Sequence, residues 1–274
     1  MALVNRAAIE ALVRAALRRE VGMELPPGGQ EPVLLPPSRM RGAHDPAAQQ
    51  ALIDATPARI AVGRCGTRYT TATLLRFRAD HAAARDAVMS EVDGKLLERL
   101  GVLVLRSQAR DRRSFLLRPD AGRALSEEAR VALAQLPQRP QLQIVYGDGL
   151  SATAINTHLE ALHGALMREL HARGIRTNPP VFVHLSRVKI MDEVAQQLGA
   201  EACLFVCGER PGLGFADSLS AYYIYRPHGG ATDADREVIS NINPRGLPPD
   251  RAAQAIAEAI ARILRERKSG VVAG

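Results

Sequence analysis

Short apolar segments alternate with helical patterns through the C-terminal two thirds of this chain. Most of these segments are continuous apolar runs, which is typical of strands that are buried on both faces of a parallel sheet. The intervening stretches are long enough to form helices that cross from one strand to the next. The pattern predicts a Rossmann-like, layered α/β domain with a mainly parallel sheet. The predicted strands are residues 102–105, 114–118, 142–146, 181–185, 202–207 and 222–225.

The most regular part of the pattern is a strand–helix–strand unit. The strand at residues 142–146 is followed by the turn GDGLS, a helix at residues 153–173, Gly174 and the strand at residues 181–185. Ser151 is a good N-cap, because its side chain can accept from a free backbone N–H group of the first helical turn. Backbone amides at such a helix start can also meet a ligand. Both an ordinary capped turn and a ligand contact are compatible with the sequence.

Three parts of the chain differ in composition, and they predict its domain organisation. Residues 1–40 combine an amphipathic helical pattern (residues 2–21) with a Pro- and Gly-rich linker. Residues 41–100 carry a Gly-punctuated loop and then apolar positions at helical spacing, which predicts a small helical N-terminal domain. Residues 101–274 form the α/β domain, and their last amphipathic helix, at residues 249–267, is expected to cover one face of the sheet.

Composition and charge narrow the possible partners. The formal net charge is +7, and arginines are densest at residues 106–118, but the chain lacks Trp and has only 4% aromatic residues. Without stacking aromatic side chains or a recognisable motif, we expect a solvated basic face or one that meets an acidic partner, and no nucleic acid. No apolar run approaches the ~20 residues of a membrane span, which favours a cytoplasmic protein that does not bind membranes. Cys203 and Cys207 lie roughly 13 Å apart along one strand, too far to form a disulfide.

Candidate ligand chemistry follows the strand at residues 202–207. Glu209 comes directly after it and is followed by the turn Gly212-Leu-Gly214. In open α/β sheets, ligands bind outside the carboxyl ends of the strands. The turn lacks the third glycine of a dinucleotide motif, and the chain contains neither a phosphate-binding GxxxxGK[ST] loop nor a GxSxG nucleophile motif. The sequence therefore predicts a ligand site near Glu209 that is of none of these three kinds.

Four motifs carry a specific resemblance: GDGLSATAI, SRVKIMDEV, GERPGLG and ADREVISNINPRG. Together with the Gly- and Arg-rich stretch after residue 59, they make the chain similar to the small subunit of ethanolamine ammonia-lyase from about residue 59 to residue 270. The resemblance implies adenosylcobalamin as cofactor, with contacts at Val188, Glu209 and Val238. The family has Cys where this chain has Val238, so a contact there would have to use packing or backbone. The chain lacks the DxHxxG motif of base-off cobalamin proteins, so base-on binding is expected.

The resemblance also implies a division of labour between two kinds of subunit. A large subunit is expected to bind ethanolamine, and this chain completes the cobalamin pocket on the other side of the corrin ring, with six copies of each chain. Radical chemistry of the cofactor then converts ethanolamine to acetaldehyde and ammonia, and the isolated chain is inactive. Residues 2–21 are candidates for contact with the shell of a bacterial microcompartment. Two alternatives remain open, namely a non-catalytic assembly module and a stand-alone nucleotide-binding transferase.

Overall fold

The computed structural model describes residues 39–40, 42–56 and 58–271. The chain divides into two units, residues 1–79 and residues 80–274, and the division falls within the helix α3 (Thr71–Met89). The amphipathic segment predicted at residues 2–21 lies outside the described residues. The domain limits predicted near residues 40 and 100 stay predictions.

The first unit contains few packed elements. The helix α2 (Pro46–Asp54) begins after Asp45, whose side chain accepts hydrogen bonds from two backbone N–H groups of the first turn. A short hairpin follows, with strands β1 (Arg64–Cys65) and β2 (Arg68–Tyr69). None of the residues of α2 is buried. Burial of apolar side chains within α2 therefore contributes little to the stability of this unit.

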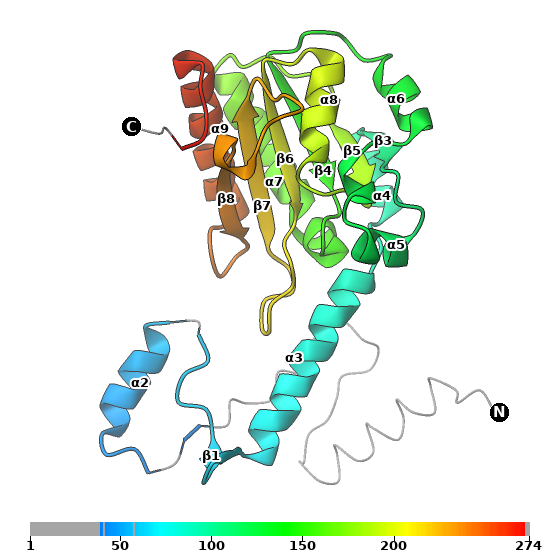
Figure 1. The fold of residues 1–274 in the computed structure, drawn as a ribbon. Helices are drawn as coiled ribbons and strands as arrows, with labels where there is room; N and C mark the ends of the chain where they lie inside the picture. The colour runs from blue at the N-terminus through cyan, green and yellow to red at the C-terminus, as the bar shows by residue number, and fades with distance from the viewer. Residues whose placement is uncertain (1–38, 41, 57, 272–274) are drawn as a thin grey trace, which may run out of the picture. The chain divides into compact units, whose positions relative to one another are not determined.

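The second unit is built around a six-stranded sheet in the described part of the chain, with strand order β3-β5-β4-β6-β7-β8 (Figure 1). The first four strands in this order pair in parallel, whereas β7 pairs antiparallel with both β6 and β8. The predicted α/β class with a mainly parallel sheet is thereby confirmed. The strands are β3 (Leu103–Arg106), β4 (Leu142–Gly147), β5 (Val181–His184), β6 (Ala202–Gly208), β7 (Leu219–Tyr225) and β8 (Glu237–Ile242).

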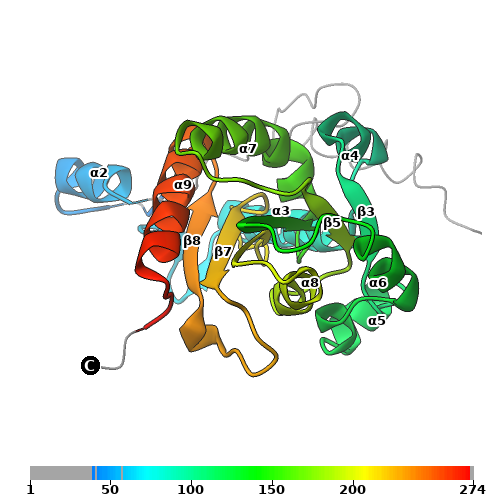
Figure 2. The same ribbon diagram turned by 90° about the horizontal axis from the view of Figure 1, so that it is seen from above.

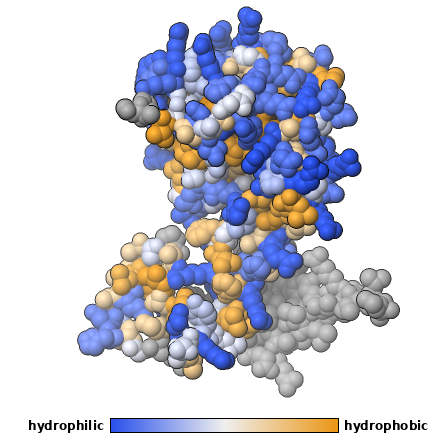
Figure 3. All heavy atoms as spheres, viewed as in Figure 1, coloured by the Kyte–Doolittle hydropathy of each residue, from blue (hydrophilic) through white to orange (hydrophobic). Residues whose placement is uncertain are grey.

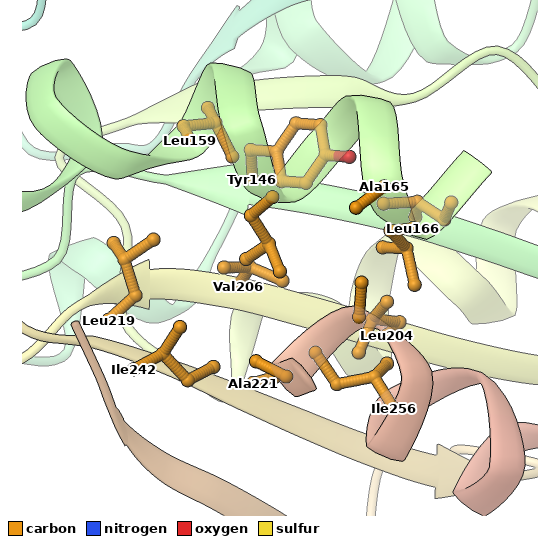
Figure 4. Close-up of a cluster of buried hydrophobic side chains, with 14 of the residues drawn as sticks. Tyr146, Leu159, Ala165, Leu166, Leu204, Val206, Leu219, Ala221, Ile242 and Ile256 are labelled. Atoms are coloured by element: carbon orange, nitrogen blue, oxygen red, sulfur yellow. The ribbon is translucent and has the colours of Figure 1, made fainter. Parts of the chain in front are cut away.

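Helices cover the two faces of the sheet unequally. The helices α7 (Ala152–Ala172) and α9 (Pro249–Glu266) lie on one face, and α8 (Ile190–Leu198) lies on the other (Figure 2). Side chains of β6 alternate between the two layers, as a strand requires: Leu204 and Val206 pack with α7 and α9, and Phe205 packs with α8. Figure 4 shows the larger of these two apolar clusters. Both faces of β6 are thus buried, which explains its continuous apolar sequence.

The long helices are amphipathic rather than apolar all round. One stripe of α9 is fully buried, including Ile256, Ile260 and Ile263, while its charged residues face solvent. As predicted, α9 covers one face of the sheet. Across the described residues, no helix combines the length and the apolar character that crossing a membrane demands.

One predicted strand is wrong. Residues 114–118 are not a strand, because Ser114 to Leu117 belong to the helix α5 (Arg112–Leu117). Asp111 accepts from the Ser114 backbone N–H, and the Ser114 hydroxyl accepts from the Asp111 N–H, which completes a capping box. The apolar run itself is compatible with a strand or a helix. The capping box favours the helix. Two further helices pack nearby, α4 (Gly94–Leu100) and α6 (Glu127–Leu133).

The turn between β4 and α7 is both capped and tightly packed. The Ser151 hydroxyl accepts from the Ala154 N–H at 3.1 Å, as predicted, and donates to the Ala216 carbonyl at 2.6 Å. The end of β6 approaches this turn so closely that a Cβ atom on Gly208 would lie 2.1 Å from the Ser151 carbonyl oxygen. Only glycine permits that approach, which fixes the position where the chain leaves β6.

The three cysteines of the chain give a direct test of this packing. Cys65 is exposed, whereas Cys203 and Cys207 are buried in β6, and burial raises the pKa of both thiols. Because the thiolate is the reactive form, we expect the native protein to react rapidly with one equivalent of a disulfide reagent such as DTNB. The unfolded protein should react with three. Cys65→Ser should remove the rapid phase, and two rapid equivalents in the native protein would contradict the buried position of β6.

Candidate functional site

An uncovered part of the sheet forms the candidate site. Among the described residues, no helix covers β7 and β8 on the face that carries α8 (Figure 1). The side chains of Tyr222 and Val238 belong to this face, the buried Ser220 is in line with them, and Glu209 lies beside them at the end of β6; we call these four residues the open strip. Tyr222 is opposite Phe205 of β6 and Val238 of β8, so all three point to the same face. Val238 is 49% exposed. In the same view, patches of apolar side chains reach the surface of the second unit among hydrophilic ones (Figure 3).

Glu209 is held at one end of the open strip by three hydrogen bonds. Its backbone N–H donates to Ser218, which continues the pairing of β6 with β7. Its carboxylate Oε1 accepts from the Ser220 hydroxyl at 2.7 Å and from the Asn241 backbone N–H at 2.6 Å. Among the described residues both donors bind Oε1, so Oε2 is available as an acceptor. The partners of the carboxylate are therefore one backbone amide and one hydroxyl.

An irregularity of β8 supplies the Asn241 donor. The register with β7 shifts between Leu219 and Ala221, and β8 accommodates an extra residue there. Asn241 has φ of 59°, in the left-handed region that Asn tolerates better than most residues. At this bulge the Asn241 N–H donates to the Glu209 carboxylate. The edge strand thus helps the Ser220 hydroxyl to position Glu209.

Tyr222 lies in the middle of the open strip and remains a hydroxyl at neutral pH. Burial raises its pKa, and the nearby Cys207 and Glu209 add to the shift, whereas Ser220 opposes it. A protonated phenol can donate and accept hydrogen bonds while its ring offers a flat apolar surface. The Glu209 carboxylate is bonded to Ser220, two residues before Tyr222, and Val238 is opposite Tyr222, so the carboxylate lies roughly 7 Å along the strands from the pair of Tyr222 and Val238.

Val188 reaches the same side of the sheet from the loop between β5 and α8. It packs against the apolar cluster under α8, which also contacts Tyr222. A buried ion pair joins this helix to the start of β8: Arg236 donates to Asp192, and their side chains are 3% and 5% exposed. The pair fixes β8, which carries Val238, relative to α8, which follows Val188. The structure therefore brings Val188, Glu209 and Val238 to one face of the sheet.

A second buried ion pair lies at the carboxyl ends of β4 and β5. Arg112 donates to Asp148 at 3.1 Å, with side chains 13% and 3% exposed, and also contacts the carbonyl groups of Ser90 and Gly149. Burial raises the pKa of Asp148, and the charge of Arg112 together with backbone N–H groups opposes that shift. The basic run at residues 106–118 was expected to be a solvated or partner-facing surface. Arg112 departs from that expectation, because it holds the turn after β4 in place.

The sequence identified only part of this site. Ser220, Tyr222 and Asn241 were not singled out, although the alternation of Ser218, Ser220 and Tyr222 with apolar residues has the period of a half-open strand. The donors on Glu209 come from residues 11 and 32 positions away, a pairing that no local pattern reveals.

The chemistry of the open strip fits a corrin ring. Such a ring is large and flat and is fringed with neutral amides, which donate N–H groups. Oε2 of Glu209 can accept such a donor, Tyr222 offers a hydroxyl, and Val238 offers exposed apolar surface. The donor set on this face is therefore suited to an amide-fringed macrocycle.

Comparison with known proteins gives one consistent result. Residues 46–273 match the family model described as ethanolamine ammonia-lyase light chain. Three similar proteins are named ethanolamine ammonia-lyase small subunit. They come from Clostridium acetobutylicum (42% identity; 79% of this chain and 90% of the relative), Fusobacterium nucleatum subsp. nucleatum (43%; 78% and 73%) and Clostridium tetani (42%; 79% and 74%). The resemblance in the sequence motifs is confirmed, and the chain belongs to the ethanolamine ammonia-lyase light-chain family.

Proposed function

We propose that this chain is the small subunit of an adenosylcobalamin-dependent ethanolamine ammonia-lyase and completes the cobalamin site of a large catalytic subunit. The observation that carries this proposal is the placement of Val188, Glu209 and Val238 on one face of the sheet, around a strip that no helix covers. When bound, adenosylcobalamin supplies the radical chemistry that the conversion of ethanolamine to acetaldehyde and ammonia requires.

The residues of this chain bind and orient the ring rather than react. Glu209 accepts an amide N–H of the ring periphery through Oε2, while Ser220 and Asn241 keep the carboxylate in place. Val238 and the ring of Tyr222 would offer apolar surface to the bound ring. Because the family resemblance implies that a large subunit binds ethanolamine, we expect this chain to be inactive alone.

The finer parts of the proposal rest on the family resemblance. They are base-on binding of the cofactor, an assembly with six copies of each subunit, and contact of residues 2–21 with a microcompartment shell.

The test is reconstitution of activity. Acetaldehyde release from ethanolamine and adenosylcobalamin is measured for the large subunit alone, for this chain alone and for the mixture. We expect activity in the mixture only. A folded, associated mixture that stays inactive would overturn the proposal and favour a non-catalytic assembly module, and activity of this chain alone would favour a stand-alone transferase.

A further inference from the structure

A group of arginines lies beside the open strip, at the carboxyl ends of β4, β5 and β6. Arg187 follows β5 and immediately precedes Val188, and Arg210 immediately follows Glu209. Arg112 and Arg123 approach from α5 and from the short helical turn after it. The positive charges of Arg210, Arg123 and Arg112 all act on Arg187. Arg112 and Arg187 also share the Phe115 ring, with guanidinium carbons 5.4 and 4.2 Å from its centre.

Arg187 is fixed in place without an anionic partner of its own. Its guanidinium carbon lies 4.2 Å from the centre of the Phe115 ring, and its Nη2 donates to the Phe115 carbonyl at 3.1 Å. Its Nε is buried and has no acceptor among the described residues. Buried donors in native proteins are nearly always satisfied, so an unused donor in a rigid, half-buried Arg calls for an explanation.

The charges around Arg187 do not balance. Asp148 is the anion that attracts it, but Asp148 is already paired with Arg112 at 3.1 Å and accepts the Ser186 N–H at 3.2 Å. Burial lowers the pKa of Arg187, and the three neighbouring arginines lower it further. Binding of an anion with several acceptor oxygens would stabilise such a repulsive arrangement. Arg binds phosphate groups through bidentate hydrogen bonds.

We infer that Arg187, supported by Arg210 and Arg123, binds the phosphodiester of the nucleotide loop of cobalamin. The inference rests on the proposed function. The corrin periphery carries neutral amides, and the phosphodiester is the single anionic group of the nucleotide loop, so it is the part of the cofactor that a cationic cluster selects. Because Val188 and Glu209 are sequence neighbours of Arg187 and Arg210, the arginines lie at the border of the open strip, where a loop attached to the edge of the ring would reach them.

The experiment uses the complex of this chain with its large subunit and two cofactor analogues. Adenosylcobinamide lacks the nucleotide loop, and adenosylcobinamide phosphate retains its phosphate. Binding is measured by equilibrium dialysis with detection by visible absorbance, in the absence of ethanolamine. We expect the wild-type complex to bind the phosphate-bearing analogue roughly 10- to 100-fold more tightly. Arg187→Gln should bind both analogues equally, and Arg187→Lys should keep part of the preference.

Controls separate the two proposals. Arg118→Gln removes an exposed arginine that pairs with Asp120, so it should keep the full preference for the phosphate-bearing analogue. Unchanged affinity of Arg187→Gln for adenosylcobinamide shows that the variant is folded. Equal binding of both analogues by the wild-type complex, or an undiminished preference in Arg187→Gln, would overturn the inference alone. If the wild-type complex binds neither analogue nor adenosylcobalamin, the proposed function itself fails.

Discussion

Replacing Arg236 with Ala is expected to destabilise the protein by about 3–5 kcal/mol. The substitution leaves the carboxylate of Asp192 buried under α8 with its partner removed, and it also removes hydrogen bonds to Thr232 and Asp233. Urea unfolding followed by circular dichroism measures the change in the free energy of unfolding. Arg265→Ala is the matched control, because Arg265 is 74% exposed and 3.8 Å from its partner, and it should change stability by less than about 0.5 kcal/mol.

The pH dependence of the variant distinguishes an unpaired charge from a simple loss of packing. Burial raises the pKa of Asp192 and Arg236 opposes that shift, so without Arg236 the pKa of this carboxyl rises further. When the pKa of a carboxyl is higher in the folded than in the unfolded protein, the protein becomes less stable as pH rises between the two pKa values. The loss of unfolding free energy caused by Arg236→Ala should therefore grow between about pH 4 and pH 7. A loss of unfolding free energy that is independent of pH, or that is below about 1 kcal/mol at pH 7, would contradict this account.

Replacing Glu209 with Gln is expected to weaken binding of adenosylcobalamin by the two-subunit complex roughly 10- to 100-fold, as loss of a charge-assisted hydrogen bond predicts. Gln keeps the size of the side chain but lowers the strength of the acceptor presented to the ring amides. Gln also has a single acceptor oxygen, which Ser220 and Asn241 would occupy, and its NH2 group cannot accept from a ring amide. Affinity is measured by cofactor titration in equilibrium dialysis.

Two further variants define the role of this carboxylate. Ser220→Ala removes one of the two groups that position Glu209 and should give a smaller loss of affinity than Glu209→Gln. Glu160→Gln changes a carboxylate on α7, 56% exposed and paired with Arg99, and should leave affinity unchanged. Wild-type affinity in a folded Glu209→Gln complex would remove this residue from the cofactor site.

The parts of the fold that sequence predicted well are those whose signal is local. The unit from β4 through α7 to β5 has continuous apolar strands and a Ser151 cap, and both are properties of adjacent residues. The helix α5 was mistaken for a strand because its six residues are too few to show a helical period. The edge strand β8 was missed because it alternates between partly buried and exposed positions and contains only Ile242 as a buried residue.

The site was predictable only in outline. The position of Glu209 at a strand end follows from the apolar run before it. The bulge at Asn241, the pairing of Arg112 with Asp148 across 36 positions and the contact of Arg236 with Asp192 across 44 positions depend on how distant segments meet. Such contacts depend on the packing of the whole molecule. Local patterns in one sequence therefore carry no signal for them.

None of the described helices covers Tyr222 and Val238, and this exposure also affects how the protein can change during evolution. Val238 is half exposed, and exchanges at exposed positions usually alter stability by less than about 0.5 kcal/mol. A mutation from Cys to Val at this position, or the reverse, can therefore persist without repacking the core. Folding stability therefore constrains the surface at Val238 only weakly and leaves cofactor binding as its main constraint, whereas Phe205 and Val206 are constrained by packing on the two faces of β6. Sequence divergence within the family should accordingly concentrate on the outer strands rather than on β6.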